Sequence, residues 1–288
     1  YFMIKKDTQG VTFAKGFTAA GVKAGIKKSG NLDVAVIYTK TQAVVAGTFT
    51  QNKVAAAPVY VSKEVVATGT AHAIVANAGC ANACTGQQGL DDAHKMAQIA
   101  ADELGVNADD VIVGSTGVIG INLPMDKLEA GIKDAVANLS ADGSGNAGRA
   151  IITTDTHSKS VTCEFELSGK TVRMGAIAKG SGMIRPNMAT MLCYITTDIA
   201  IDQALLQKAV SGCVEKSFNM ISVDGDMSTN DMVIVLANGE ANNAKITEEN
   251  ADYQIFFDKL MMLCTELAKQ IAADGEGASK FLTINVKG

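Results

Sequence analysis

The sequence predicts an α/β fold with a mostly aliphatic core, and three observations lead to this prediction. Segments with the two-residue period of strands alternate along the chain with segments that have the 3.6-residue period of helices. Hydrophobic residues make up 47% of the 288 residues, yet only 5% are aromatic and none is tryptophan. The 28 glycines against three prolines indicate many tight turns. A chain of this length can form one large domain or two smaller ones, and the pattern leaves the strand order open.

Short runs of β-branched or alternating residues predict the strands. Residues 161–167 alternate apolar and polar side chains, and Ser168-Gly169 turns them into residues 171–178, which predicts a hairpin. Further strands are predicted at residues 73–76, 111–113 and 190–196.

Helices are predicted where apolar residues recur on one face. Residues 91–104 begin with two aspartates, which favour the positive end of a helix, and Gly105 ends the segment. Pro124 can open another helix in its first turn, and Asp202 lies near the start of a third. The apolar faces are at Leu128, Ile132 and Val136; at Leu206, Ala209, Val210, Cys213 and Val214; and at Ile255, Phe256, Leu260, Leu263, Leu267 and Ile271.

Charge and cysteine usage exclude several classes of protein. A net charge of -5 and a pI near 5.3 argue against the basic face of a nucleic-acid-binding protein. No apolar run approaches the roughly 18–20 residues that span a bilayer, and no charged-then-apolar leader opens the sequence. The six cysteines are scattered, so reduced thiols are expected rather than a disulfide framework. Cys80 and Cys84 lack the second ligand pair of a zinc site.

Thr190, in the run KGSGMIRPNMATML (residues 179–192), lies where a glycine-rich loop gives way to an apolar, strand-like segment. Inside a chain, a threonine hydroxyl has no neighbouring base. If the Ala189–Thr190 bond is cut, the new terminal amine can act as that base, since it titrates near 7.7–8.0 against about 10.4 for lysine. The hydroxyl can make the cut by attacking the Ala189 carbonyl, and water then hydrolyses the ester. On these residues alone, an ordinary threonine opening a buried strand is the commoner case.

The same run resembles the processing site of the ornithine acetyltransferase family, also called bifunctional glutamate N-acetyltransferase. The resemblance covers essentially the whole chain, because further runs similar to the family follow in family order. These are KGFTAAGVKAGIKKSGNLDVAVI (15–37), GTFTQNKVAAAPV (47–59), NAGCANACTGQQGLDDA (77–93), GSTGVIG (114–120), TTDT (153–156), SVDGDMSTNDMV (222–233) and DGEGASKF (274–281). The family pattern continues past Gly288, so a further substrate-binding portion is expected outside this sequence.

The resemblance implies a layered α-β-β-α sandwich of the self-processing, N-terminal-threonine type, with Thr190 at a strand start in its middle. Residues 1–189 correspond to the family's alpha chain. Residues 190–288 correspond to the first part of its beta chain, which folds with the alpha chain into one sandwich. Pairs of the two fragments assemble in the family, so a heterotetramer is expected.

The resemblance also implies a site. Thr190 is implied as the nucleophile, with the Thr116 hydroxyl and the Gly117 N–H as oxyanion donors, each worth about 10²–10³ in rate. The implied substrate contacts are Thr153, Lys179, Thr190 and Glu276. An ammonium at Lys179 suits a substrate α-carboxylate, and a carboxylate at Glu276 suits the ammonium of ornithine.

The expected function is acetyl transfer from N-acetylornithine to glutamate, by a ping-pong route through acetyl-Thr190, in cytoplasmic arginine biosynthesis. No metal or organic cofactor is expected. Some members of the family also use acetyl-CoA as donor, which this sequence leaves open. Two alternatives remain: a related self-processing aminopeptidase or amidohydrolase that passes the acyl group to water, and an unprocessed, inactive fragment.

Each site residue also has an ordinary structural interpretation. GSTGVIG can be a plain turn, Lys179 a solvated lysine, Thr153 a cap and Glu276 part of a surface turn. The aspartates of SVDGDMSTNDMV are interpreted as tight-turn residues that order the site, because the glycine and glutamate of a calcium loop are misplaced.

Overall fold

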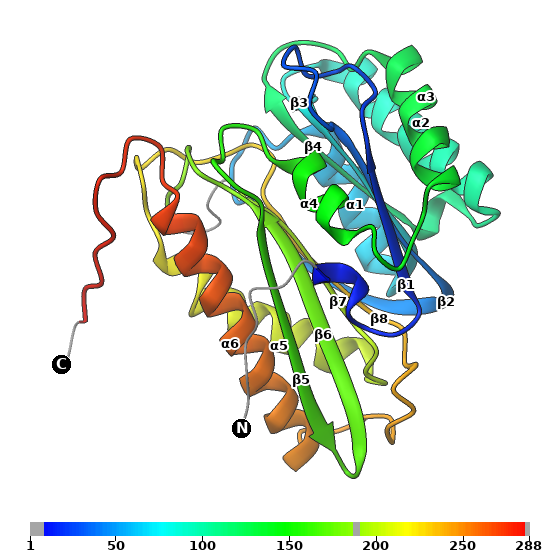
Figure 1. Ribbon diagram of the computed structural model, residues 1–288, viewed down its shortest axis with the longest axis vertical. Coiled ribbons are helices and arrows are strands. Elements are labelled where there is room, and N and C mark those ends of the chain that lie inside the picture. The colour runs from blue at the N-terminus through cyan, green and yellow to red at the C-terminus, as the bar shows by residue number, and fades with distance from the viewer. Residues whose placement is uncertain (1–8, 187–190, 286–288) are drawn as a thin grey trace.

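The computed structural model describes residues 9–186 and 191–285 (Figure 1). In this part of the chain the strands form one hydrogen-bonded sheet in the order β4-β3-β2-β8-β7-β6-β5, with β1 against β2. The strands are β1 (Phe17–Val22), β2 (Val34–Phe49), β3 (Thr70–Cys80), β4 (Val111–Val118), β5 (Lys159–Leu167), β6 (Lys170–Lys179), β7 (Leu192–Thr197) and β8 (Met232–Ala237). The helices are α1 (Ala57–Thr68), α2 (Gly86–Leu104), α3 (Met125–Ala137), α4 (Ser144–Ile151), α5 (Gln203–Glu215) and α6 (Ala251–Ala273). Short 3₁₀ helices are at Gly10–Thr12, Ala108–Asp110 and Phe218–Met220.

Strand β2 divides the sheet into two halves. Its residues 34–39 pair with β1, and its residues 44–49 pair with β8 along the same edge. Between these stretches the register with β3 shifts, from Tyr38 to Ala43, and residues 40–42 are exposed. The chain therefore turns from a half-sheet of β1–β4 into a half-sheet of β5–β8, and the long strand β2 belongs to both.

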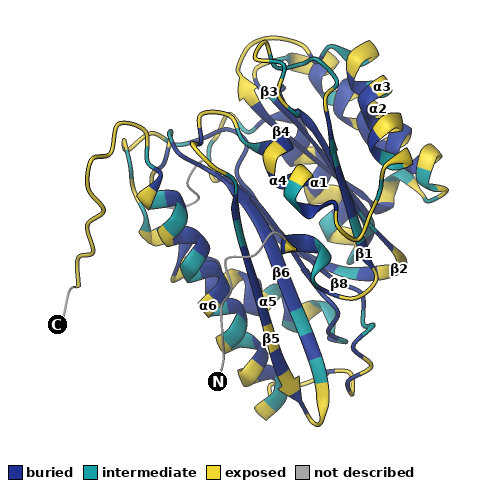
Figure 2. Cartoon of the chain, viewed as in Figure 1, coloured by how far each residue is buried: buried dark blue, intermediate teal, exposed yellow. Residues whose placement is uncertain are grey.

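The two half-sheets pack face to face. Ile37, Ile74 and Ile112 of the first half share one core with Ile177, Tyr194 and Ile234 of the second. Helix α4 contacts strands of both halves, namely β1, β2, β3 and β6. Figure 2 shows the strands as mostly buried elements between helices whose outer faces are exposed.

Helices cover the two outer faces. Met96 of α2 and Leu128 and Ile132 of α3 pack on Val75 and Val113 of the first half-sheet. On the second half-sheet, the apolar stripes of α5 and α6 pack on residues such as Val161, Ile195 and Val235. The order of layers is helix, sheet, sheet, helix (Figure 1), which confirms the predicted α-β-β-α sandwich with its aliphatic core.

Several predicted elements needed correction at their ends. The hairpin is present, with Leu167 paired to Lys170. The helix predicted over 91–104 begins at Gly86 instead, where Gln87 and Gln88 donate to carboxylates four residues on. Strand β4 continues beyond Val113 through GSTGV to Val118, so that motif is not a plain turn. Strand β2 had no clear signal, because the polar residues 39–42 interrupt its apolar pattern.

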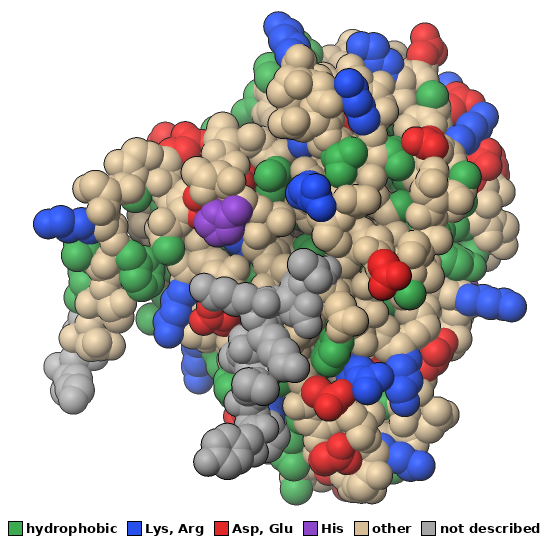
Figure 3. Space-filling view, in the orientation of Figure 1, with side chains coloured by type: hydrophobic (Ala, Val, Ile, Leu, Met, Phe, Trp, Pro, Cys, Tyr) green, Lys and Arg blue, Asp and Glu red, His purple; other side chains and the backbone are tan. Residues whose placement is uncertain are grey.

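Surface features agree with the composition. All six cysteines are free thiols, as expected. Acidic and basic side chains are interspersed on the face drawn in Figure 3. Within residues 9–186 and 191–285, no helix is both long and apolar enough to cross a membrane.

Gly114→Ala should test the face-to-face packing. A methyl group at Gly114 in β4 would lie 2.1 Å from the hydroxyl of the fully buried Tyr194 in β7, so the variant should lose about 1–3 kcal/mol of unfolding free energy. Tyr194→Phe removes that oxygen and leaves the ring carbon 3.4 Å away, so the double variant should recover most of the loss. Urea unfolding measures both effects.

Gly148→Ala in α4 is the matched control, because its new Cβ would have no neighbour closer than 3.4 Å. Its stability should hardly change. If the double variant were no more stable than Gly114→Ala alone, the packing of β4 on β7 described here would be wrong.

Candidate active site

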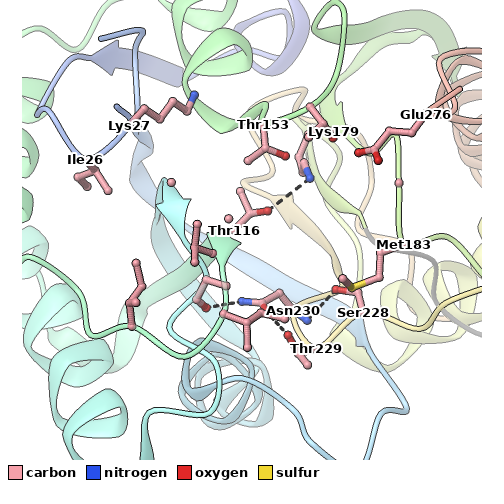
Figure 4. Close-up of a pocket in the computed structure, with 18 of the residues that line it drawn as sticks. Ile26, Lys27, Thr116, Thr153, Lys179, Met183, Ser228, Thr229, Asn230 and Glu276 are labelled. Carbon is pink, nitrogen blue, oxygen red and sulfur yellow. Dashed lines mark hydrogen bonds between the residues drawn. The ribbon is translucent and has the colours of Figure 1, made fainter. Parts of the chain in front are cut away.

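A cavity of about 880 Å³ opens where the two half-sheets meet, and it gathers the predicted site residues (Figure 4). Its wall includes all five of those residues that the structure describes: Thr116, Gly117, Thr153, Lys179 and Glu276. They come from the end of β4, the loop after α4, the end of β6 and the segment after α6. Ala189 and Thr190 lie outside the described residues.

Lys179 and Thr116 form the centre of the cavity wall. The Lys179 ammonium donates to the Thr116 hydroxyl oxygen at 3.3 Å, and both side chains are buried. Because this oxygen is the acceptor, the Thr116 hydroxyl hydrogen remains available for another partner. The ammonium likewise keeps donors that no other described residue takes. The pair can therefore offer hydrogen bonds to a negatively charged group in the cavity.

The charge of Lys179 depends on its acidic neighbours. Burial lowers the pKa of Lys179, whereas the nearby carboxylates of Asp155, Asp231 and Glu276 oppose this effect. These carboxylates favour the ammonium form in a place where a lysine alone would tend to lose its proton. The net effect is a pKa below the ordinary value, and the protonated form of Lys179 is the one suited to bind an anionic substrate group.

Gly117 requires the absence of a side chain. It adopts φ +128°, and a Cβ there would lie 2.4 Å from the backbone of Gly79 in β3. The strand pairing of β3 and β4 becomes irregular at this point. The two glycines thus let β3 and β4 approach closely where Thr116 faces the cavity.

A buried ion cluster underlies the cavity. The fully buried Lys159 ammonium lies 2.7 Å from the Asp155 carboxylate and 2.6 Å from that of Asp274. Asp155 also accepts the backbone N–H groups of Thr153 and Gly180, at 3.1 and 2.6 Å. The cluster therefore joins the start of β5, the loop after α4, the end of β6 and the end of α6.

Both carboxylates of the cluster are held in the charged form. Burial alone would raise the pKa of Asp155, but the ammoniums of Lys179 and Lys159 outweigh it and hold that pKa below its ordinary value. Burial acts in the same way on Asp274, and the hydrogen bonds from Lys159 and Thr156 reverse its effect. The cluster is thus a set of mutually neutralising charges, as burial requires.

Glu276 is placed by the same cluster. Ser181 donates its hydroxyl to the Asp274 carbonyl at 2.7 Å, and the Glu276 N–H donates to the Ser181 carbonyl at 2.7 Å. The exposed Glu276 carboxylate lies over Gly182, where a Cβ would come within 2.5 Å of it. The acidic side chain is therefore fixed at the rim, beside the end of β6.

Sequence reasoning missed the role of Asp231. It is not a turn residue: it is fully buried at the start of β8 and accepts the backbone N–H of Met191 at 2.9 Å. Burial raises its pKa well above the ordinary value, although the Met191 hydrogen bond and Lys179 oppose the rise. Neighbouring Asn230 donates to the carbonyls of Ala81 and Ser115, which ties β8 to the end of β4.

Of the other two aspartates of that motif, Asp224 does order a turn, as expected. Asp224 accepts the N–H groups of Met183, Ile184 and Asp226. Asp224 and Asp226 also line the cavity. Across the two described ranges, no group of three or more His, Cys, Asp or Glu side chains is arranged to hold a metal ion.

Lys27 was also missed, although it lies in the run KAGIKK. It lines the cavity and donates to the carbonyls of Leu32 and Ala150, at 2.6 and 3.1 Å. Burial lowers its pKa to about 8, with Asp33 and Asp155 opposing the shift. The doubled lysine was the available signal, but only the fold shows that both line the cavity and that Lys27 is the half-buried one, whereas Lys28 is exposed.

The chain is similar to known proteins over almost its whole length. The ArgJ family model matches residues 18–288. The "Arginine biosynthesis bifunctional protein ArgJ" of Symbiobacterium thermophilum is 51% identical over 281 residues, which are 97% of this chain and 70% of that protein. The chain therefore belongs to the ArgJ family.

Two solved structures agree with this assignment. Ornithine acetyltransferase from Mycobacterium tuberculosis, complexed with ornithine, is 39% identical, with a TM-score of 0.61 over 67% of this chain and all of its own. The L-aminopeptidase D-Ala-esterase/amidase of Ochrobactrum anthropi, a variant of the Ntn hydrolase fold, is 12% identical, with a TM-score of 0.56 over 93% of this chain and 86% of its own, and shows the fold alone. The expected family and an acetyl-transfer enzyme of arginine biosynthesis are confirmed.

Proposed function

We propose that the chain transfers an acetyl group from N-acetylornithine to glutamate through an acetyl ester of Thr190, in the cytoplasm. The observation that carries this proposal is the Lys179–Thr116 contact beside the start of β7. Leu192 of β7 pairs with Lys179, and Met191 is anchored by Asp231. The chain is thus fixed beside these donors one residue after Thr190. The M. tuberculosis relative, described as complexed with ornithine, supports ornithine as the product.

Processing comes first in the proposed mechanism. The Thr190 hydroxyl attacks the Ala189 carbonyl, the peptide bond becomes an ester, and water hydrolyses that ester. The products are an alpha chain of residues 1–189 and a beta chain that begins with a free threonine amine. This amine then serves as the base for the adjacent hydroxyl. In the proposed assembly, two alpha chains and two beta chains form a heterotetramer.

Acetyl exchange follows in two half-reactions. In the first, the Thr190 hydroxyl attacks the acetyl carbonyl, its proton passes through the terminal amine to the leaving nitrogen, and ornithine departs. In the second, the amine of glutamate attacks the ester, which restores the hydroxyl and yields N-acetylglutamate. Each half forms an oxyanion, for which the Thr116 hydroxyl and the Gly117 N–H are the proposed donors.

The charges around the cavity suit these substrates. The Lys179 ammonium would take the α-carboxylate, and Thr153 would contact the same part of the substrate. Glu276 would receive the side-chain ammonium of ornithine, since its carboxylate is exposed at the rim. The hydrolase alternative uses the same cavity and differs only in passing the acetyl group to water.

Thr190→Ala should abolish self-cleavage and acetyl exchange together, because both need the hydroxyl. Thr190→Ser keeps a hydroxyl and should retain part of each activity. Intact mass spectrometry counts the fragments, and ornithine release is measured with and without glutamate. Thr171→Ala, on the β5–β6 hairpin away from the cavity, should behave as wild type.

If the Thr190→Ala variant still exchanged acetyl groups between ornithine and glutamate, the nucleophile would be another residue. Continued release of ornithine by the wild type without glutamate, beyond the one equivalent per site that accompanies formation of acetyl-Thr190, would identify the hydrolase alternative instead.

Thr116→Ala should slow turnover of the already cleaved enzyme by about 10²–10³, or roughly 2.7–4 kcal/mol, because one oxyanion donor is lost. KM should change little, since this donor acts mainly in the transition state. The melting temperature should stay close to that of the wild type, because a single hydrogen bond contributes only about 1 kcal/mol. Normal turnover, or a loss explained by unfolding, would make Thr116 a structural residue only.

A further inference from the structure

The loop between β1 and β2 presents Lys27 to the cavity in a fixed position. Asp33 is fully buried, and its carboxylate accepts the backbone N–H groups of Ala24, Ile26 and Lys27 at 2.6, 2.6 and 2.9 Å. Three such bonds hold the loop rigidly where its residues 26–29 line the cavity. The backbone of Lys27 is thus set in place before any ligand arrives.

The Lys27 side chain brings a positive charge that lacks a carboxylate partner. Its ammonium donates to two carbonyl oxygens, those of Leu32 and Ala150, which leaves one donor without a partner among the described residues. Within those residues no carboxylate lies within ion-pair distance of it, and Asp33 is engaged by the backbone. With a pKa of about 8, Lys27 is mostly charged at neutral pH. A half-buried, unmatched cation at a cavity wall is a place for an anion.

The two substrates of the proposed reaction differ in the charge of the side chain. Ornithine ends in an ammonium, whereas glutamate ends in a carboxylate, and both must present the same nitrogen to the same hydroxyl. The Glu276 carboxylate can attract the first side chain but repels the second. Figure 4 shows Lys27 and Glu276 on opposite sides of Lys179, so the cavity has one cationic and one anionic side.

We infer that Lys27 binds the side-chain carboxylate of the acceptor glutamate and so determines which amino acid receives the acetyl group. Lys27 lies next to the proposed α-carboxylate site, because Ala150, its hydrogen-bond partner, is three residues before Thr153. Lys27 and Lys179 both line this cavity (Figure 4). A dicarboxylate can neutralise both cations at once, which a molecule with one carboxylate cannot. This inference rests on the proposed function.

Lys27→Gln tests the inference, since glutamine keeps a donor for the Leu32 and Ala150 carbonyls but removes the charge. Acetyl transfer is measured with glutamate and with glutamine, which is nearly isosteric but neutral. The wild type should prefer glutamate. In Lys27→Gln the KM for glutamate should rise about 10- to 100-fold, as for a lost charge-assisted hydrogen bond, while the KM for glutamine changes far less. Lys27→Arg keeps the charge and should retain the preference.

Lys23→Gln is the control, because Lys23 is an exposed lysine of the same loop that does not line the cavity. It should leave the preference for glutamate intact. Equal losses with both acceptors would make Lys27 a structural residue of the loop, and an unchanged KM for glutamate would also overturn the inference.

Ornithine release before glutamate is added reports the donor step. If the wild type released no ornithine, the proposed function itself would be at fault rather than the role of Lys27.

Discussion

The contact on which the cavity depends is the buried ion cluster of Lys159 with Asp155 and Asp274. A fully buried ammonium is tolerated only because both carboxylates lie within hydrogen-bond distance of it. Asp155 then accepts the backbone N–H groups of Thr153 in its own loop and of Gly180 at the end of β6, and Asp274 accepts that of Thr156 from the loop after α4. Removing the ammonium would leave two buried negative charges facing each other. The cluster thus joins the loop after α4 and the end of α6 to the paired ends of β5 and β6. The strand pairing alone does not determine where that loop and that helix end lie.

The cluster also links structure to chemistry. Asp155 belongs to it and is at the same time one of the charges that oppose the loss of the Lys179 proton. Lys179 in turn donates to Thr116 on the other half-sheet. A chain of contacts therefore runs from the end of α6 to the end of β4. In the proposed reaction, this chain would set the substrate carboxylate, the oxyanion donors and the rim carboxylate relative to one another.

Much of the fold could be predicted from the sequence, because local patterns report local structure. The hairpin around Ser168-Gly169 and the helices α3, α5 and α6 each carry a complete signal in their own residues. Strand β2 does not, because polar residues at its bend interrupt the apolar pattern. The layer order came from the family resemblance, since pairing between distant strands leaves no local trace.

The site residues likewise divide into those that the sequence could predict and those that only the fold shows. The resemblance brought Thr116, Gly117, Thr153, Lys179 and Glu276 together, and the structure places all five around one cavity. The family resemblance did not imply a role for Lys159 or Lys27. A lysine in a sequence is usually solvated, and only the fold shows which lysines are buried. Asp231 resembled its turn-forming neighbours Asp224 and Asp226, yet it is the one that enters the core.

Amide hydrogen exchange of Lys159→Met tests most directly whether the buried cluster organises the cavity. The N–H groups of Thr153, Thr156 and Gly180 bond to the cluster carboxylates, whereas those of Ala24, Ile26 and Lys27 bond to Asp33. The account predicts that the first three exchange together about tenfold faster or more, as local opening becomes easier, while the second three keep their protection. Unchanged exchange of the first three amides, or an equal acceleration of both sets, would contradict it.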